Sequence, residues 1–309
     1  MLPVMSKLLA EIFKMCVLFL YFNDTPEPNK YRLIVASNRD ELWDRATKLL
    51  GYWDQDKNCM SGQDCQKGNA EGSTWLGMSK TGKFGVLLNI LGFNDSHRES
   101  RGHLVRNFLT SDLDCHSYIK QCVRPNKDLY NGFHLLLLDC SGEKTDVAYF
   151  NNKIDACNCE DIPQENEFIC LGNSVCGKTP WKKMARGKEL FKNIIRDFNN
   201  KDKNAELKNK LVSLLQDRKS FADDKLLKCQ AQNSHPEESP EDLDRRVRRL
   251  SSLFVKMPEK RYGTRTHSII TVDYEGHCEF LEKTLVTPVD EDNFQWKDTV
   301  LQFDIQTSK

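Results

Sequence analysis

The periodicity of this chain changes twice, and that change limits its fold more than any other feature. Short runs rich in Leu, Val, Ile and Phe, separated by Gly, Asn, Asp and Pro, fill much of the chain up to residue 171 and are typical of strands. A helical pattern follows over 180–257, and strand-like runs return at residue 266. Strands, then helices, then strands again predict an α+β domain in which helices cover stacked sheets. We predict strands at 16–22, 31–36, 73–79, 83–89, 132–138, 145–150, 167–171, 266–272, 277–283 and 298–304, and helical structure within 98–122.

The long helical block has a recognisable start. Thr179 is a suitable N-cap residue, and Pro180 after it suits the first helical position. Apolar residues then recur at helical spacing over 181–198, 207–215 and 243–257. We interpret these stripes as faces that pack on the core, rather than as cofactor-binding elements.

Two polar stretches of this block are expected to lie at the surface. Residues 229–242 contain several Ser, Pro and Glu residues and are predicted to form a long surface loop. The basic run Arg245–Arg249 lies on the last helix, and of its five residues only Val247 is expected to point inward. A solvated helix face is therefore favoured over a phosphate-binding patch.

Composition excludes some classes of partner. The chain has 309 residues, of which 39% are hydrophobic, so it can bury one large core or two modest ones. Lys plus Arg and Asp plus Glu number 45 each, so the whole-chain charge gives no electrostatic reason to expect binding to nucleic acid. We expect a soluble globular protein, and nothing in the pattern indicates its oligomeric state.

The twelve cysteines are spread over a medium-sized chain without a CxxC pair. Their only local cluster is Cys157 and Cys159, with Cys170 and Cys176 beyond, and its spacings do not fit paired zinc ligands. We expect reduced structural or surface thiols and no metal site.

The first fourteen residues are apolar but contain charges. Lys7, Glu11 and Lys14 interrupt the run, so it is too short for a membrane helix and unlike the uncharged centre of a signal peptide. Residues 5–14 fit a short amphipathic helix, suited either to organelle targeting or to simple packing. We therefore divide the chain into an extension, 1–14, and one domain, 15–309.

A candidate nucleophile lies near the start of the first predicted strand. Cys16 begins that strand, and Arg39 and Asp40 follow the next one. If the two strands form a hairpin, thiol, guanidinium and carboxylate come together, the grouping needed for a thiolate whose pKa is lowered by a nearby cation. The alternative interpretation is a buried strand cysteine beside a solvated turn.

Four motifs in a fixed order carry a resemblance to a known family. They are Asn38–Glu41 (NRDE), Gly72–Gly77 (GSTWLG), Tyr130–Leu135 (YNGFHL) and Tyr262–Ser268 (YGTRTHS). With these motifs the chain resembles the NRDE family from Met15 to about Phe303. The resemblance implies a fold similar to N-terminal-nucleophile hydrolases, a four-layer αββα sandwich of two sheets between helical layers.

The resemblance also implies a set of site residues. Cys16 falls at the position of the nucleophile, and Arg39 and Asp40 fall beside the thiol. Asn89 and Asn173 correspond to amides that bind an oxyanion, and Arg265 corresponds to a second arginine. This chain departs from the pattern, because residues 1–14 leave Cys16 without a free α-amine to act as base. His134 and His267 stand where asparagine is expected, and we interpret both as tolerated polar substitutions.

A competing motif belongs to a different class of protein. Residues 172–179 fit the phosphate-binding loop G-x-x-x-x-G-K-[ST] between a predicted strand and a helix, with Lys178 at the lysine position. Pro180, however, disfavours helical geometry at Thr179, and the alternation of strands and helices that such proteins need does not follow. Nucleotide binding is kept as a remote alternative.

Three functions follow from these observations. The resemblance implies an intracellular, non-enzymatic factor with a role in Golgi organisation and protein secretion, and lipid homeostasis or haem transfer besides. The second is a cysteine amidohydrolase that uses Cys16 on a non-peptide C–N bond, and the third is the nucleotide-binding protein. We favour the first. Catalysis would need no cofactor, haem would be a cargo, and the family points to the cytoplasm with Golgi and mitochondrial association.

Overall fold

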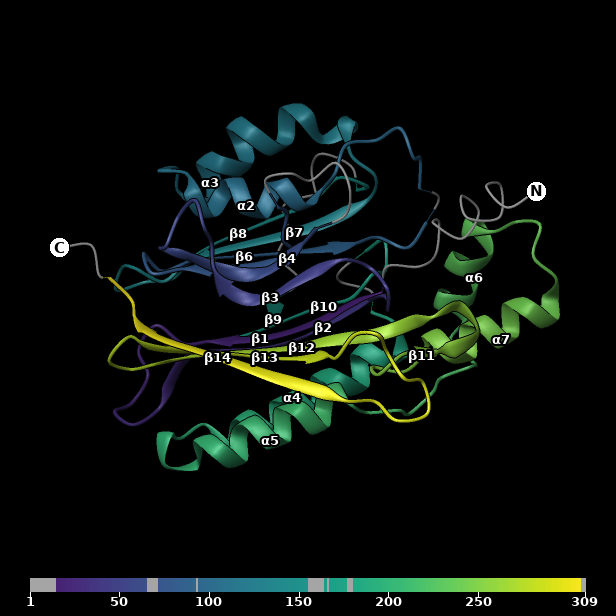
Figure 1. Ribbon diagram of the computed structural model, residues 1–309. Coiled ribbons are helices and arrows are strands. Elements are labelled where there is room, and N and C mark those ends of the chain that lie inside the picture. The colour runs from purple at the N-terminus through teal and green to yellow at the C-terminus, as the bar shows by residue number, and fades with distance from the viewer. Residues whose placement is uncertain are drawn as a thin grey trace.

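The computed structural model describes residues 15–65, 72–92, 94–154, 164–165, 167–176 and 180–306, and these form four layers (Figure 1). Two helices cover one sheet, a second sheet lies against the first, and two longer helices cover its outer side. The predicted α+β, four-layer αββα architecture is confirmed.

The larger sheet carries both ends of the described chain. In order across the sheet its strands are β14 (Trp296–Asp304), β13 (His277–Leu285), β12 (Tyr262–Asp273), β2 (Tyr31–Leu42), β1 (Cys16–Phe22), β10 (Phe168–Leu171) and β9 (Gln164–Glu165), with β11 (Lys256–Met257) paired to β12. Every pair is antiparallel, and β12 joins β2 through one of the longest ladders. The C-terminal strands thus complete a sheet that the N-terminal hairpin begins.

The smaller sheet is built from the middle of the sequence. It runs in chain order: β3 (Thr47–Tyr52), β4 (Cys59–Asp64), β5 (Leu76–Ser79), β6 (Lys83–Asn89), β7 (Phe133–Asp139) and β8 (Asp146–Asn151). Its outer face is covered by α2 (Gly102–Thr110) and α3 (Cys115–Tyr118). Strands β3 and β4 were not predicted, because charged and small residues in them hide the alternation.

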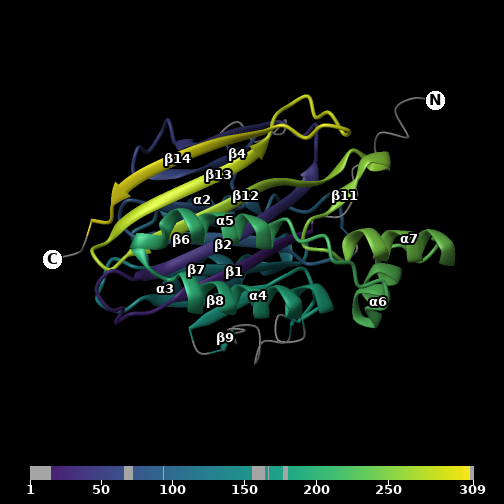
Figure 2. The same ribbon diagram turned by 90° about the horizontal axis from the view of Figure 1, so that it is seen from below.

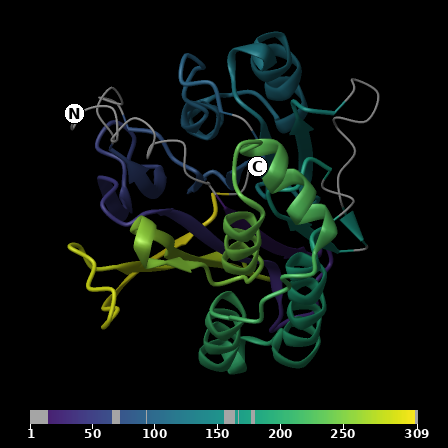
Figure 3. The ribbon, with the colours of Figure 1, turned by 90° about the vertical axis from the view of Figure 1, so that its right-hand side faces the viewer.

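Helices α4 (Lys182–Phe198) and α5 (Asn204–Leu215) cover the outer face of the larger sheet, as the view in Figure 2 shows. Helices α6 (Lys225–Ser234) and α7 (Pro240–Leu250) pack beside β11 at one end of the sandwich, the end that faces the viewer in Figure 3. Among the described helices, none is long and apolar enough to cross a membrane.

Alternation along β1 shows how the two cores form. Cys16, Leu18 and Leu20 face the smaller sheet, while Val17, Phe19 and Tyr21 face α4 and α5. Both sets are buried, because a strand between two layers has no solvent face. The apolar run that predicted this strand is therefore explained by its central position.

The structure corrects three predictions of the helical block. Its first helix begins at Lys182 after Trp181, not at Pro180. Helix α6 occupies the start of the predicted loop 229–242. In the basic run, Arg246 is buried along with Val247, and donates hydrogen bonds to Ala231 O and to Glu238.

Candidate functional site

The hairpin of β1 and β2 brings the predicted residues together. Cys16 lies opposite Arg39 in the antiparallel register, and β2 continues through Asp40 to Leu42. The four NRDE residues are all buried, so the interpretation of this quartet as a solvated turn is wrong. The hairpin on which the proximity of thiol, guanidinium and carboxylate depended does form, and Cys16 is also a buried strand residue, as the alternative interpretation expected.

Hydrogen bonds hold the main chain on both sides of the Met15–Cys16 peptide bond. The Met15 N–H donates to the Tyr262 hydroxyl at 2.8 Å, and the Cys16 N–H donates to Asn173 Oδ1 at 2.8 Å. The Asp40 N–H donates to Met15 O at 3.0 Å. The Met15 side chain is fully buried in an apolar cluster with Trp181, Tyr262 and residues of α6 and α7. Cys16 is therefore an internal residue with a covered N-terminal side.

This environment makes Cys16 a weak acid. Burial, followed by the Asp40 carboxylate, raises the pKa of the thiol to about 12, and the Asp40 N–H and the Arg39 guanidinium offset only part of that rise. The expectation of a thiol whose pKa is lowered is wrong for the chain in which Met15 precedes Cys16.

Asp40 is buried with one of its carboxylate oxygens unused. Thr264 donates its hydroxyl to Asp40 Oδ1 at 2.6 Å, while Asp40 Oδ2 has no hydrogen-bond partner among the described residues. Burial raises the pKa of Asp40, and the nearby Lys183 ammonium opposes that rise. Lys183 is itself buried, and donates to Leu250 O at 2.9 Å and Ser252 O at 3.2 Å.

Arg39 is engaged by carboxylates and an aromatic ring. Its Nη2 lies 3.5 Å from Asp64 Oδ2 and 3.7 Å from Glu41 Oε2. Its guanidinium carbon lies 4.0 Å from the centre of the Trp75 ring. Arg45 binds the same two acids, with Nε at 2.7 Å from Asp64 Oδ2. These contacts place Arg39 in a buried ion network that links β2 to β4.

The two predicted asparagines form a chain of hydrogen bonds. Asn173 accepts from the Cys16 N–H and donates its own Nδ2 to Asn89 O at 2.6 Å. Asn89 thus contributes its main-chain carbonyl to this chain. Gln230 of α6 donates to Asn173 O at 3.0 Å and to Leu91 O at 2.7 Å, which fixes the segment after β10.

Two further arginines complete the charged surroundings. Arg265 donates Nη1 to Leu42 O at 3.2 Å and to Arg45 O, and burial together with Arg39 lowers its pKa to about 10. Arg101 precedes α2 and donates Nη1 to Gly132 O at 2.7 Å. Burial lowers the pKa of Arg101 to about 10, and Cys16 opposes that shift.

Sequence reasoning missed several of these residues. Thr264 and Tyr262 lie inside a motif that was singled out, so their motif was a usable signal. Nothing comparable in the sequence indicates a role for Lys183, Gln230 or Arg101. A single polar residue in or next to an amphipathic helix is ordinarily solvent-exposed.

The histidines at the two departures from the family pattern have structural contacts. His134 contacts the Tyr149 hydroxyl at 2.7 Å and Ser174 O at 2.8 Å, and its burial lowers its pKa to about 4. His267 Nδ1 lies 2.6 Å from Asn38 Oδ1, and the ring stacks on Trp296. Both rings join neighbouring segments of the core.

The competing motifs fall partly outside the described residues. Residues 177–179 of the phosphate-loop motif 172–179 lie outside the described residues. The same holds for Cys157 and Cys159 of the cysteine cluster and for the extension 1–14. In the part of the chain that is described, the side chain of Asn173, a residue of the phosphate-loop motif, accepts a hydrogen bond from the Cys16 N–H. Also within that part, no group of three or more His, Cys, Asp or Glu residues is arranged to hold a metal ion.

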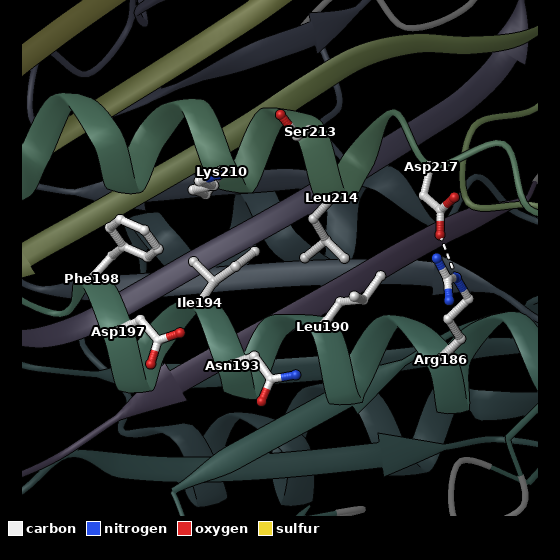
Figure 4. Close-up of a pocket in the computed structure, with 10 residues that line it drawn as sticks. All are labelled: Arg186, Leu190, Asn193, Ile194, Asp197, Phe198, Lys210, Ser213, Leu214 and Asp217. Atoms are coloured by element: carbon white, nitrogen blue, oxygen red, sulfur yellow. Dashed lines mark hydrogen bonds and ion pairs between the residues drawn. The ribbon is translucent and has the colours of Figure 1, made fainter.

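A groove lies elsewhere, between α4 and α5 (Figure 4). Leu190, Ile194, Phe198 and Leu214 line it, and an ion pair of Arg186 with Asp217 at 2.6 Å lies at one end. Cys16 faces the other side of the larger sheet, so this groove is separate from the thiol.

Comparison with known proteins identifies the relatives of the chain. The sequence model of the family described as Transport and Golgi organisation 2 matches residues 15–287. The Transport and Golgi organization 2 homolog of Mus musculus is 34% identical over 95% of this chain and 100% of its own length. The Transport and Golgi organization protein 2 of Drosophila melanogaster is 31% identical over 94% of this chain and 99% of its own length.

One of the solved structures that match the chain resembles it only loosely. It is a mutant of the conjugated bile acid hydrolase from Clostridium perfringens, at a TM-score of 0.36 and 9% identity over 94% of this chain and 98% of that one. A superposition this loose carries no argument about chemistry.

Proposed function

Because this chain belongs to the Transport and Golgi organisation 2 family, we propose that it acts in Golgi organisation and protein secretion as a binding factor that hydrolyses no amide bond. Family membership supports the first part of this proposal. The claim that the protein hydrolyses no amide bond rests on the burial and the raised pKa of Cys16.

The observation that carries the proposal is the covered, internal thiol. Cys16 has no α-amine, because its nitrogen is an amide held by Asn173. Met15 fills the space before it, and the pKa of the thiol is raised to about 12. A thiol in this state supplies very little thiolate at neutral pH, so it is a poor nucleophile.

A rescue experiment tests both parts. In cells depleted of their own family member, we expect the protein to restore Golgi morphology and the rate of secretion of a reporter. We expect Cys16→Ala to restore them equally well, with Cys229→Ala, a change at an exposed cysteine, as the matched control. Failure of the unchanged protein would refute the cellular role. Failure of a folded Cys16→Ala protein alone would show that the thiol is needed.

A second candidate function follows from the contacts of the Met15–Cys16 peptide bond. If the chain were cut before Cys16, Asn173 would hold a free α-amine next to the thiol. That amine could take the thiol proton while the Asp40 N–H, which now donates to Met15 O, binds the oxygen of a substrate carbonyl. The product would be a cysteine amidohydrolase acting on a C–N bond.

Intact mass and N-terminal sequencing of protein from its own cells distinguish the two functions. A chain that begins at Cys16 and hydrolyses amides until Cys16 is changed to Ala would establish the hydrolase. A chain that retains Met15 supports the binding factor. We expect the second result, because Met15 is fully buried and both of its polar main-chain atoms are bonded.

Lipid or haem is the cargo that we propose for such a factor. Titration of the purified protein with haem, followed by absorbance, and sedimentation with lipid vesicles measure the two cases. Binding of neither would restrict the proposal to a role through protein partners. The same measurements on protein purified from cells would report any cargo that it already carries.

A further inference from the structure

Arg101 differs from Arg39 and Arg45 in having little to neutralise its charge. Arg39 and Arg45 each lie in ion-pair contact with Glu41 and Asp64. Among the described residues, no carboxylate lies in ion-pair contact with Arg101, whose one hydrogen bond is to Gly132 O. A guanidinium has five N–H donors, so most of those of Arg101 have no acceptor in the described part of the chain.

The main chain holds Arg101 in place. Arg101 precedes α2, and a Cβ added at the next residue, Gly102, would lie only 2.5 Å from Ser73 Cβ. The Thr74 N–H donates to Gly102 O at 3.3 Å, which fastens this helix start to the smaller sheet. The acceptor of the side chain is fixed too, because the Ile90 N–H donates to Gly132 O. The main chain at Arg101 is therefore fixed, while the residue as a whole is half-buried.

The neighbours of Arg101 are those of the candidate site. Cys16, Glu41 and Arg45 lie within electrostatic range of its guanidinium. Arg265, 3% exposed, is also within electrostatic range of Glu41, and its Nε has no hydrogen-bond partner among the described residues. Arg101 and Arg265, which both lie within electrostatic range of Glu41, thus have unused donors and form no ion pair among the described residues.

We propose that Arg101 binds the anionic group, a carboxylate or a phosphate, of a small-molecule ligand beside Cys16, with Arg265 as a second source of positive charge. A half-buried cation has lost part of its hydration, so an anion that contacts it is favoured, and a planar guanidinium suits both oxyanions through paired hydrogen bonds. This inference rests on the proposed function in that it names the ligand class of the same site, and it holds for a binding factor and for a hydrolase alike.

The nearby acids do not neutralise the positive charge of Arg101. Glu41 and Asp64 are shared between Arg39 and Arg45. Asp40 is buried, and burial favours its neutral, protonated form. Among the described residues near the thiol, the remaining charge is therefore positive, and an incoming oxyanion would offset it.

Thermal unfolding in the presence of simple anions tests the proposal. We compare the unchanged protein with Arg101→Gln, Arg101→Lys and a matched control, Arg98→Gln. Arg98 lies three residues earlier, is exposed and pairs with Asp95 at 3.7 Å. Each protein is titrated with sodium phosphate and, separately, with sodium acetate, against sodium chloride at equal ionic strength.

For the unchanged protein and for Arg98→Gln, we expect phosphate or acetate to raise the unfolding temperature in a saturable way that chloride does not reproduce. For Arg101→Gln we expect the apparent affinity to fall about tenfold or more, since a charge-assisted contact is lost. Arg101→Lys should bind at an intermediate strength, because lysine keeps the charge without the paired donors. The anion that binds more tightly distinguishes a phosphate from a carboxylate ligand.

Two results would overturn the proposal. One is an equal response of Arg101→Gln and the unchanged protein, and the other is no saturable response of the unchanged protein to either anion. If Arg101→Gln does not fold, an unchanged response of Arg101→Lys would count against the proposal in the same way. None of these results depends on Golgi rescue or on hydrolysis, so failure here is separate from failure of the proposed function.

Discussion

At the scale of single residues, Cys16 shows how neighbours decide chemistry. Its thiol, the Arg39 guanidinium and the Asp40 carboxylate are close, as a hairpin requires. Burial and the Asp40 carboxylate nevertheless outweigh the Asp40 N–H and the Arg39 guanidinium, so the pKa of the thiol rises instead of falling. A correct set of side chains is thus not sufficient for a reactive cysteine.

We predict that Cys16 is alkylated by iodoacetamide far more slowly than Cys229, by roughly a hundredfold or more at pH 8, since the thiolate is the reacting species. Cys16 is also buried, whereas Cys229 is exposed on α6. Peptide mass spectrometry over a time course measures both rates. Comparable rates at the two sites in the folded protein would contradict this account of Cys16.

At the scale of elements, the contact of α4 with the larger sheet depends on one small residue. A Cβ at Gly187 would lie 2.3 Å from the Phe19 ring of β1. Phe19 is fully buried and packs against Phe191 of the same helix at a ring separation of 5.8 Å, so its ring has little room to yield. Gly187 therefore sets the distance between helix and sheet.

We predict that Gly187→Ala destabilises the protein by about 1–3 kcal/mol through overpacking, although alanine is the better helix former. Chemical denaturation measures the change. Ala185→Gly is the matched control at an exposed position of the same helix, where propensity alone should cost about 1 kcal/mol. A more stable Gly187→Ala protein would show that the sheet and the helix can separate without cost.

At the scale of the whole molecule, a buried carboxyl group links the two sheets. Glu282 of β13 is 2% exposed and accepts a hydrogen bond from the Leu50 N–H of β3 at 3.0 Å. Its other oxygen has no partner among the described residues. Burial raises the pKa of Glu282 to about 7. The cost of burying this group is thus smallest when it is protonated, although the hydrogen bond from the Leu50 N–H favours the ionised form.

We predict that Glu282 makes the stability of the protein fall as the pH rises from about 4.5 to 7. Over that range the unfolded chain releases a proton that the folded chain retains, which amounts to about 3 kcal/mol for this group. Glu282→Gln keeps an acceptor for Leu50 and removes the titration.

The difference in unfolding free energy between the unchanged protein and Glu282→Gln should therefore shift in favour of the variant by about that amount between pH 4.5 and 8. Denaturant unfolding at several pH values measures it, and Glu206→Gln at an exposed position of α5 is the control for the substitution itself. A difference that stays constant with pH would contradict the raised pKa of Glu282.

Local pattern was a good guide to the elements. Strands 16–22 and 83–89 were predicted with their observed bounds, because each is rich in apolar residues and lies inside a sheet. Strands β3 and β4 and helix α6 were missed, since their polar residues make contacts that periodicity does not reveal. The proposed division into an extension and one domain of residues 15–309 stays a prediction.

The sequence by itself determined where most strands and helices form, that they belong to an α+β sandwich, and that Cys16 meets Arg39, because periodicity and short-range pairing are local properties. Only the tertiary structure decided which charges are buried and which way each pKa moves. The residues that surround these groups are distant in the chain. Asn173 accepts from the Cys16 N–H, Tyr262 accepts from the Met15 N–H, and Lys183 lies near Asp40. Desolvation depends on all the atoms packed around a group, and most of those atoms come from elsewhere in the sequence.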